Sequence, residues 1–206
     1  MCIVHSTLRF ATSPYTERCV QYTKNHHNLK LTILFFIIIS NFGFSQIEIS
    51  NDTLIEWNKP QKLKWTDFKG KPLKEPGITV AATQCHVKVV DSYFDNKGIP
   101  IFTVKCYFSK NESWTIVSNL ETLEHEQLHF DLWEFITRKI RKAFSELNNA
   151  SEKNVSVYQK KYGELIDYGI ELQNQYDSES YFSEKGQNKW NKKILNGLKK
   201  LDKYAL

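Results

Sequence analysis

A five-residue string near the middle of the chain could carry out chemistry, because it consists of His125, Glu126, Gln127, Leu128 and His129. On a helix the two histidines lie four residues apart and share one face, where their ring nitrogens can bind a single Zn²⁺ ion. Glu126 would then face the water held by that zinc and act as its base. The pattern predicts metal-assisted hydrolysis, most often of a peptide bond.

The residues around this string predict the helix that it requires. Ser118 and Glu121 form a capping box of the S-x-x-E type, and leucine, isoleucine and phenylalanine recur after it at helical spacing. We therefore predict a helix over about 118–148, followed by helices over about 153–174 and 187–204. The alternative interpretation of the string is an amphipathic helix that carries two surface histidines.

The chain before this helix predicts an antiparallel hairpin. Residues 79–93 and 101–108 have the alternating, β-branched composition of strands, and the turn-like segment 95–98 joins them. We expect a register that sets Cys85 opposite Cys106 and leaves one face of the hairpin apolar. A cross-strand disulfide between these cysteines is one interpretation, and two buried free thiols are the other.

Strands that are followed by helices indicate an α+β fold. We expect an antiparallel hairpin or meander that packs on a zincin-like HExxH helix, with two further helices after it. The chain has 206 residues, of which 41% are hydrophobic, and this suits one globular domain. We assign residues 47–206 to that domain and residues 1–46 to a leader.

The leader contains the features of a secretory signal. An apolar run from Leu31 to Ile39 follows the basic Lys30, is too short to span a bilayer, and leads to small residues before Gln46. We expect export to the periplasm or the medium with cleavage near Gln46, and an uncleaved N-terminal anchor is the alternative. Residues 1–28 are polar and unlike a signal, which suggests that translation starts at Leu29.

The charge of the chain does not indicate a nucleic-acid partner. The leader holds four of the 28 basic and one of the 23 acidic residues, so 24 and 22 remain and the net charge falls from +5 to +2. The lysines near the C-terminus lie on the polar face of the third helix, as expected of a solvated surface. We expect a peptide or protein substrate, no nucleic acid and no stable membrane span in the mature form.

A catalytic zinc normally takes three protein ligands, and the HExxH string supplies only two. The longer metzincin motif is excluded, because its glycine and last histidine would fall at Leu132 and Phe135. Asp131 and Glu134 are turned away from the shared face of the histidines at about 100° per residue. The third ligand must therefore come from elsewhere in the chain.

The remaining candidates are His86 and several later carboxylates. His86 has the strand parity opposite to the apolar face, so we favour a surface histidine there. A carboxylate after the HExxH helix would complete the His₂Glu type of site. Five acidic residues fulfil this condition on or after the second helix: Glu164, Asp167, Glu171, Asp177 and Glu179.

The residues around the string resemble a known family. Segment 123–131 reads LEHEQLHFD, and Glu134 and Arg138 follow it. This resembles the bacterial family catalogued as domain of unknown function 922, which is described as secreted zinc-dependent proteases. Four further elements of that family have counterparts here, in the same order: Trp65 to Gly70 (W-x-D-F-x-G), Ala81 to Thr83 (A-A-T), Ser113 with Trp114 (S-W), and Tyr176 with Asp177 before Gln187 and Trp190 (Y-D, Q-x-x-W).

The resemblance covers most of the mature chain but departs at one place. In the family pattern a Thr-x-His step follows the Y-D element, whereas this chain has Ser180, Tyr181 and Phe182. If that family histidine is the third zinc ligand, either Asp177 or Glu179 replaces it here, or zinc is held weakly.

These observations together predict an exported zinc metallopeptidase. His125 and His129 bind Zn²⁺, Glu126 is the catalytic base, and Tyr176 is a candidate donor to the oxyanion, with a core tyrosine as the alternative. Two other functions stay open. One is an exported binding or assembly protein that keeps a degenerate site, and the other is a zinc amidase that acts on non-protein amides.

Overall fold

The computed structural model describes residues 53–74, 77, 79–181 and 183–206. The predicted leader, its signal at Leu31 to Ile39, and Phe182 lie outside these residues. The elements, in chain order, are β1 (Leu54–Glu56), a short 3₁₀ helix η1 (Trp65–Asp67), β2 (Ala81–Ala82), β3 (Cys85–Phe94), β4 (Pro100–Ser109), β5 (Trp114–Thr115), α1 (Leu120–Asn149), α2 (Val155–Ser180), α3 (Glu184–Lys200) and η2 (Asp202–Tyr204).

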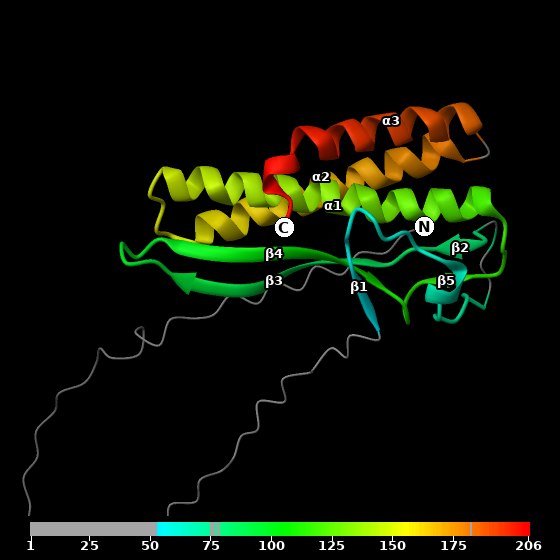
Figure 1. Cartoon of the computed structure of the whole chain (residues 1–206), viewed down its shortest axis with the longest axis horizontal. Helices are drawn as coiled ribbons and strands as arrows, with labels where there is room; N and C mark the ends of the chain where they lie inside the picture. Colours follow the sequence, from blue (N-terminus) through cyan, green and yellow to red (C-terminus); the bar gives the residue numbers. More distant parts are fainter. Residues whose placement is uncertain (1–52, 75–76, 78, 182) are drawn as a thin grey trace, which may run out of the picture. The chain divides into compact units, whose positions relative to one another are not determined.

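The strands form two small antiparallel sheets. One has the order β1-β4-β3, and the other pairs β2 with β5. Figure 1 shows the three helices on one side of the long β3–β4 hairpin, with β2 and β5 near the start of α1. The fold is therefore mixed α+β with strands first and helices afterwards, as the sequence predicts.

The hairpin register differs from the prediction by two residues. Cys85 pairs with Phe108, and Cys106 pairs with Val87. Because a shift of two residues keeps every side chain on its face, the apolar face is retained and both cysteines are buried. The thiols are free in the structure, which agrees with the second of the two interpretations, two buried free thiols. A β-bulge between Val89 and Asp91 accompanies the change of register along the strand.

Helix α1 is the central element of the domain. It packs against β4 on one side and against α2 and α3 on the other, and for this reason it buries residues around most of its circumference. Among the largest buried side chains are Trp133, Leu132 and Ile136. Its N-cap is Asn119, whose side chain accepts a hydrogen bond from the Thr122 amide, and not the predicted Ser118. Within the HExxH string, Glu126, Leu128 and His129 are consequently buried, whereas His125 and Gln127 are half-buried.

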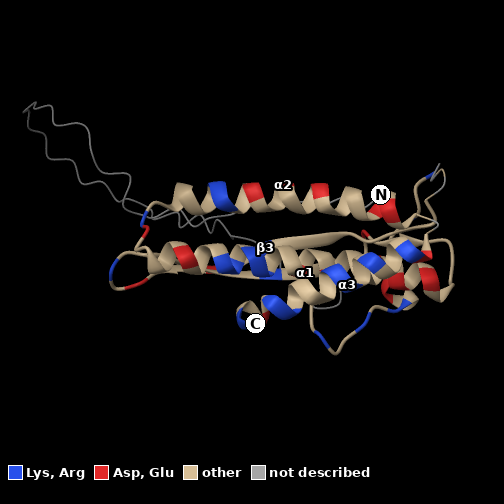
Figure 2. Ribbon diagram, turned by 90° about the horizontal axis from the view of Figure 1, so that it is seen from above, with Lys and Arg blue, Asp and Glu red and all other residues tan. Residues whose placement is uncertain are grey.

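Helices α2 and α3 pack on α1 and on each other. Helix α2 continues to Ser180, six residues beyond its predicted end, because Tyr176 and Ser180 are buried in its last turns. Helix α3 starts at Glu184, where Ser183 caps it by accepting from the Gly186 amide. Figure 2 shows charged residues of both signs along α2, whereas the charged residues of α3 are lysines apart from Glu184 at its start.

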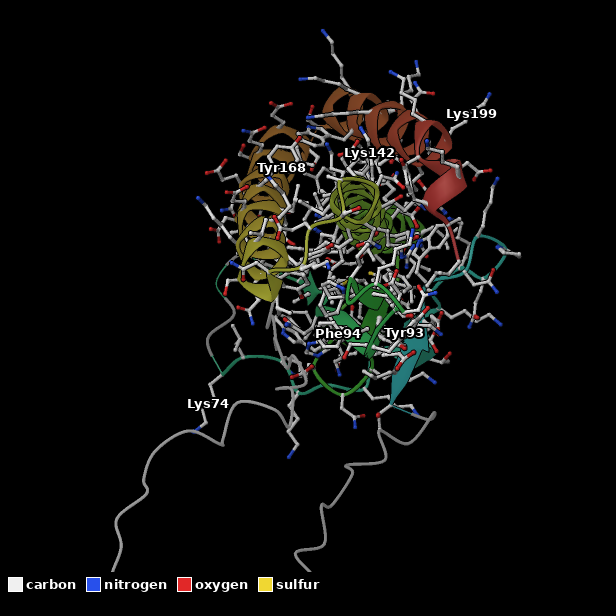
Figure 3. All side chains as sticks on the ribbon, turned by 90° about the vertical axis from the view of Figure 1, so that its left-hand side faces the viewer. Lys74, Tyr93, Phe94, Lys142, Tyr168 and Lys199 are labelled. Carbon is white, nitrogen blue, oxygen red and sulfur yellow. The ribbon has the colours of Figure 1, made fainter. Side chains whose placement is uncertain are left out.

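The interior between the helices and the sheet is filled by side chains, as the view along the helices shows (Figure 3). Lys74 and Lys199 extend outward in this view, and Tyr93 and Phe94 lie at the end of the hairpin. Both of these aromatic side chains are about half exposed, at 56% and 49%. None of the helices in the described part of the chain combines the length and hydrophobicity that a membrane span requires.

Candidate metal centre

Three helix segments meet around the HExxH string: the first turns of α1, the last turns of α2 and the start of α3 (Figure 1). The second sheet approaches from the other direction, because the Thr83 hydroxyl, just after β2, donates to the Glu126 carbonyl at 3.3 Å. Since α1 is anchored on both sides, the side chains of its first turns have fixed surroundings.

Asp177 completes a group of three potential metal ligands with the two motif histidines. The Nε2 atoms of His125 and His129 are 3.2 Å apart. The Asp177 Oδ1 atom lies 2.9 Å from Nε2 of His129 and 3.4 Å from Nε2 of His125. Among the described residues this is the only group of at least three histidine, cysteine or acidic side chains close enough to share an ion.

The spacing of these three atoms fits a zinc ion. Two ligand atoms bound at about 2.05 Å to a tetrahedral zinc lie about 3.3 Å apart. The three separations of 2.9, 3.2 and 3.4 Å bracket this value. The side chain of His129 is buried, whereas those of His125 and Asp177 are 23% and 27% exposed, so solvent reaches one side of the group. Three ligands with one accessible side are typical of catalytic zinc.

Unpartnered polar atoms gather at the same place. In the described part of the chain, four buried side-chain nitrogen or oxygen atoms have no hydrogen-bond partner. Three of them are Glu126 Oε2, His129 Nδ1 and Asp177 Oδ1. The Asp177 oxygen lies at ion-pair distance from both histidines but without the direction of a hydrogen bond. Buried polar groups are normally paired, so Asp177 Oδ1 and Glu126 Oε2 indicate a place that a metal ion and its water would fill, whereas His129 Nδ1 is on the other side of its ring.

The electrostatics of the group follow from its close packing. Burial alone would raise the pKa of Asp177, but His125 and then His129 outweigh it and hold that pKa well below its ordinary value. Burial likewise opposes the charged form of His125, yet the contacts with Asp177 and Glu126 raise its pKa above the ordinary value. The group therefore attracts positive charge, which a metal cation can supply in place of protons.

Tyr176 lies behind His125 and not beside the metal-facing atoms. Its hydroxyl is 2.9 Å from Nδ1 of His125 and donates to the Gln187 side-chain oxygen at 2.8 Å. Nδ1 is the ring nitrogen that does not face His129 and Asp177. The hydroxyl of Tyr176 contacts the opposite side of the imidazole and its side chain is buried, which agrees with the alternative of a core tyrosine, and the oxyanion role stays a prediction. Burial raises the pKa of Tyr176 far above its ordinary value, which keeps the hydroxyl protonated.

Glu179, the other predicted third ligand, is not brought to the histidines. Its Oε2 accepts from Lys189 Nζ at 2.7 Å and from Trp190 Nε1 at 2.9 Å, and so it connects α2 to α3. The side chain of Asp177 projects toward the histidines, whereas Glu179 lies two residues further along the same helix, a rotation of about 200°. The continuation of α2 through these residues thus decides between the two carboxylates.

His86 and the two acids excluded by their spacing, Asp131 and Glu134, are engaged elsewhere. His86 is buried, contrary to the expected surface position, and its Nε2 contacts Glu112 Oε2 at 2.5 Å. Asp131 accepts from the Trp57 indole at 2.8 Å. Glu134 pairs with Arg138 at 2.9 Å. The predicted orientation of these two acids, away from the histidine face, is confirmed.

Sequence landmarks far apart in the chain come together near this group. The amide of Gly70 donates to the Ser113 carbonyl at 2.7 Å, and a Cβ at Gly70 would lie only 2.7 Å from that oxygen. The Ser113 hydroxyl accepts from the Gln84 amide, next to Thr83. The sequence alone assigns Gln187 no role in the site. Its position in the Q-x-x-W element is the one sequence feature that singles it out.

Comparison with known proteins identifies no relative: no family model, no curated protein and no solved structure matches the chain.

Proposed function

We propose that the protein is an exported zinc-dependent hydrolase that cleaves peptide bonds. The observation that carries the proposal is the convergence of His125, His129 and Asp177, with their three ligand atoms separated by 2.9 to 3.4 Å. The adjacent buried Glu126, whose Oε2 has no partner, supports it. The resemblance of five ordered sequence elements to a family of secreted zinc-dependent proteases points in the same direction.

Each residue has a distinct role in this proposal. The Nε2 atoms of His125 and His129 and the Oδ1 atom of Asp177 would hold the ion. When bound, zinc would lower the pKa of water and polarise the carbonyl of the substrate. Glu126 Oε2 accepts a proton from the attacking water and returns it to the leaving amine nitrogen. With Asp177 as the third ligand, the proposed site has three protein ligands and requires none from position 182.

The roles are tested by metal content and turnover measured on the same preparations. We expect about one zinc per chain after purification without chelators, and loss of that zinc in His129→Ala. Glu126→Gln should keep the zinc but lower the hydrolysis of a fluorescently labelled, unfolded protein by roughly 10²–10⁴-fold. Full turnover by Glu126→Gln would contradict the mechanism.

The other two functions give different results in the same experiment. An exported binding or assembly protein with a degenerate site would be purified without stoichiometric metal. A zinc amidase would contain zinc and lose activity in Glu126→Gln, but it would hydrolyse an amide of cell-wall material and leave the unfolded protein intact. The unpartnered Glu126 oxygen favours the hydrolases over the binding protein, because a buried carboxylate without a partner is costly when it has no function.

A further inference from the structure

We propose that Gln187 is a positioning residue which, together with the Tyr176 hydroxyl, keeps the proton of neutral His125 on Nδ1. Its ring then presents the Nε2 lone pair to the metal. This inference rests on the proposed function of the site. It adds a residue of α3 to a centre whose ligands all come from α1 and α2.

Oxygen atoms surround the Nδ1 atom of His125. Tyr176 Oη lies at 2.9 Å, Gln187 Oε1 at 3.2 Å and Ser180 Oγ at 3.5 Å. The amide oxygen of Gln187 can only accept a hydrogen bond, so its proximity favours a proton on Nδ1. The Tyr176 hydroxyl donates to Gln187 Oε1 at 2.8 Å or to the His125 carbonyl at 3.1 Å, and with either acceptor its oxygen is free to accept from Nδ1. A neutral imidazole with its proton on Nδ1 has the lone pair on Nε2.

The orientation of the Gln187 amide is itself held by a neighbour. Its Nε2 donates to Oδ1 of Asn191 at 3.0 Å, one turn later on α3. The amide nitrogen is therefore directed along the helix, and the oxygen is directed to the imidazole. The contacts run from Asn191 through Gln187 to His125. Asn191 fixes the orientation of the Gln187 amide, and the Gln187 oxygen in turn acts as the acceptor at His125 Nδ1.

The backbone places Gln187 at a narrow junction between α2 and α3. Its neighbour Gly186 lies so close to the end of α2 that a Cβ there would clash with the carbonyl oxygen of Glu179. Such a close approach is open only to glycine. The first turn of α3 is consequently pressed against the last turn of α2, and Gln187 reaches His125 from this position.

His129 shows why this support matters for His125. The Nδ1 atom of His129 is buried and has no hydrogen-bond partner. The polar contacts of its ring are confined to Nε2, whereas the more exposed ring of His125 stacks on Tyr176 with centroids 4.6 Å apart and also has polar contacts at Nδ1. A metal-binding histidine normally donates its second nitrogen to an acceptor, and loss of that acceptor lowers metal affinity about 10–100-fold. Of the two histidines, only His125 has such an acceptor.

The experiment compares four substitutions in the full chain by competition with a zinc-binding chromophoric chelator. Gln187→Leu removes the acceptor, Gln187→Glu keeps an acceptor, and Tyr176→Phe removes the hydroxyl. Tyr162→Phe is the matched control, because this buried tyrosine of α2 donates to the Val87 carbonyl and does not touch the site. We expect zinc to bind about 10–100-fold more weakly in Gln187→Leu and Tyr176→Phe. The affinity of Gln187→Glu and Tyr162→Phe should stay within a few-fold of the original.

A second measurement observes the proton directly. Nitrogen-15 NMR of the histidine side chains should show an Nδ1-bound proton on neutral His125 in the original chain and in Gln187→Glu, and loss of this preference in Gln187→Leu. Unchanged zinc affinity in Gln187→Leu and Tyr176→Phe would overturn the inference, as would an equal loss in Tyr162→Phe. If the original chain binds no zinc, the proposed function fails, and the NMR measurement on the metal-free chain still decides the position of the proton.

Discussion

The Asp177 carboxylate on α2 lies 2.9 Å from the Nε2 atom of His129 on α1. The two side chains belong to different helices, and the contact exists because α2 continues through Asp177 while it packs along α1. This contact brings a third candidate ligand to a motif that supplies two. It also makes Asp177 the residue on which the proposed metal site depends most directly.

Substitution of Asp177 should separate the two carboxylates that the sequence left as alternatives. Asp177→Asn keeps the shape of the side chain but removes its charge, and we expect zinc affinity to fall roughly 100-fold or more. Glu179→Gln is the matched control, because Glu179 contacts Lys189 and Trp190 and not the histidines. Competition with a chromophoric chelator measures the zinc affinity of both variants. Equal affinities for the two variants would mean that Asp177 is not a ligand.

The pH dependence of zinc binding follows from the pKa of His125. Burial opposes the charged form of His125, but Asp177 and Glu126 raise its pKa above the ordinary value in the metal-free protein. At lower pH His125 is therefore protonated, and zinc must displace that proton in order to bind. Asp177, whose pKa is lowered, stays ionised over the same range. We expect zinc affinity to fall at least about tenfold per pH unit below the pKa of His125 and to level off above it.

The stability of the metal-free protein should fall as pH rises, whereas its zinc affinity should increase. A raised pKa in the folded state means that His125 contributes stability which is fully present below its unfolded pKa and lost as pH rises through the folded pKa. The increase in melting temperature that zinc produces should therefore be larger at pH 8 than at pH 6. Thermal melts with and without zinc at the two pH values measure this, and a larger increase at pH 6 would contradict it.

Glu134 has a structural role in α1 that is independent of the metal site. Its Oε1 pairs with Arg138 at 2.9 Å and with Arg141 at 3.0 Å, and Arg138 is 3% exposed. Glu134→Ala would leave the buried Arg138 charge without this partner, so we expect a loss of about 3–5 kcal/mol in the free energy of unfolding. Glu124→Ala, at an exposed position of the same helix, should change it by no more than about 0.5 kcal/mol. Denaturant unfolding measures the free energy of unfolding of both variants. Equal losses in the two variants would contradict the structural role of Glu134.

The two buried cysteines should remain reduced and unreactive. Burial raises the pKa of the Cys106 thiol well above its ordinary value, and the register sets Cys85 against Phe108. We expect iodoacetamide to label the peptides that contain Cys85 and Cys106 only after denaturation, as read by mass spectrometry. A disulfide-linked peptide pair from the native protein would show that the register is wrong.

The sequence by itself determined the three helices, the hairpin and two of the three candidate metal ligands. Period-3.6 and period-2 patterns are local properties, so they predict the α1 helix, the hairpin and its apolar face. The spacing of His125 and His129 likewise places both on one side of a helix whatever surrounds it. The predicted register was wrong by two residues because both pairings bury the same face, and the hydrophobic pattern cannot distinguish them.

The tertiary structure decided which distant residues join the motif. Asp177 and Glu179 have the same chemistry, and only the continuation of α2 to Ser180 and its packing along α1 turn Asp177 toward the histidines. Gln187 reaches His125 because Gly186 lets α3 approach α2 closely. These contacts depend on the positions of whole helices, which are set by burial of side chains throughout the core. No local pattern of residues encodes them, whereas the HExxH string is local and was readable from the start.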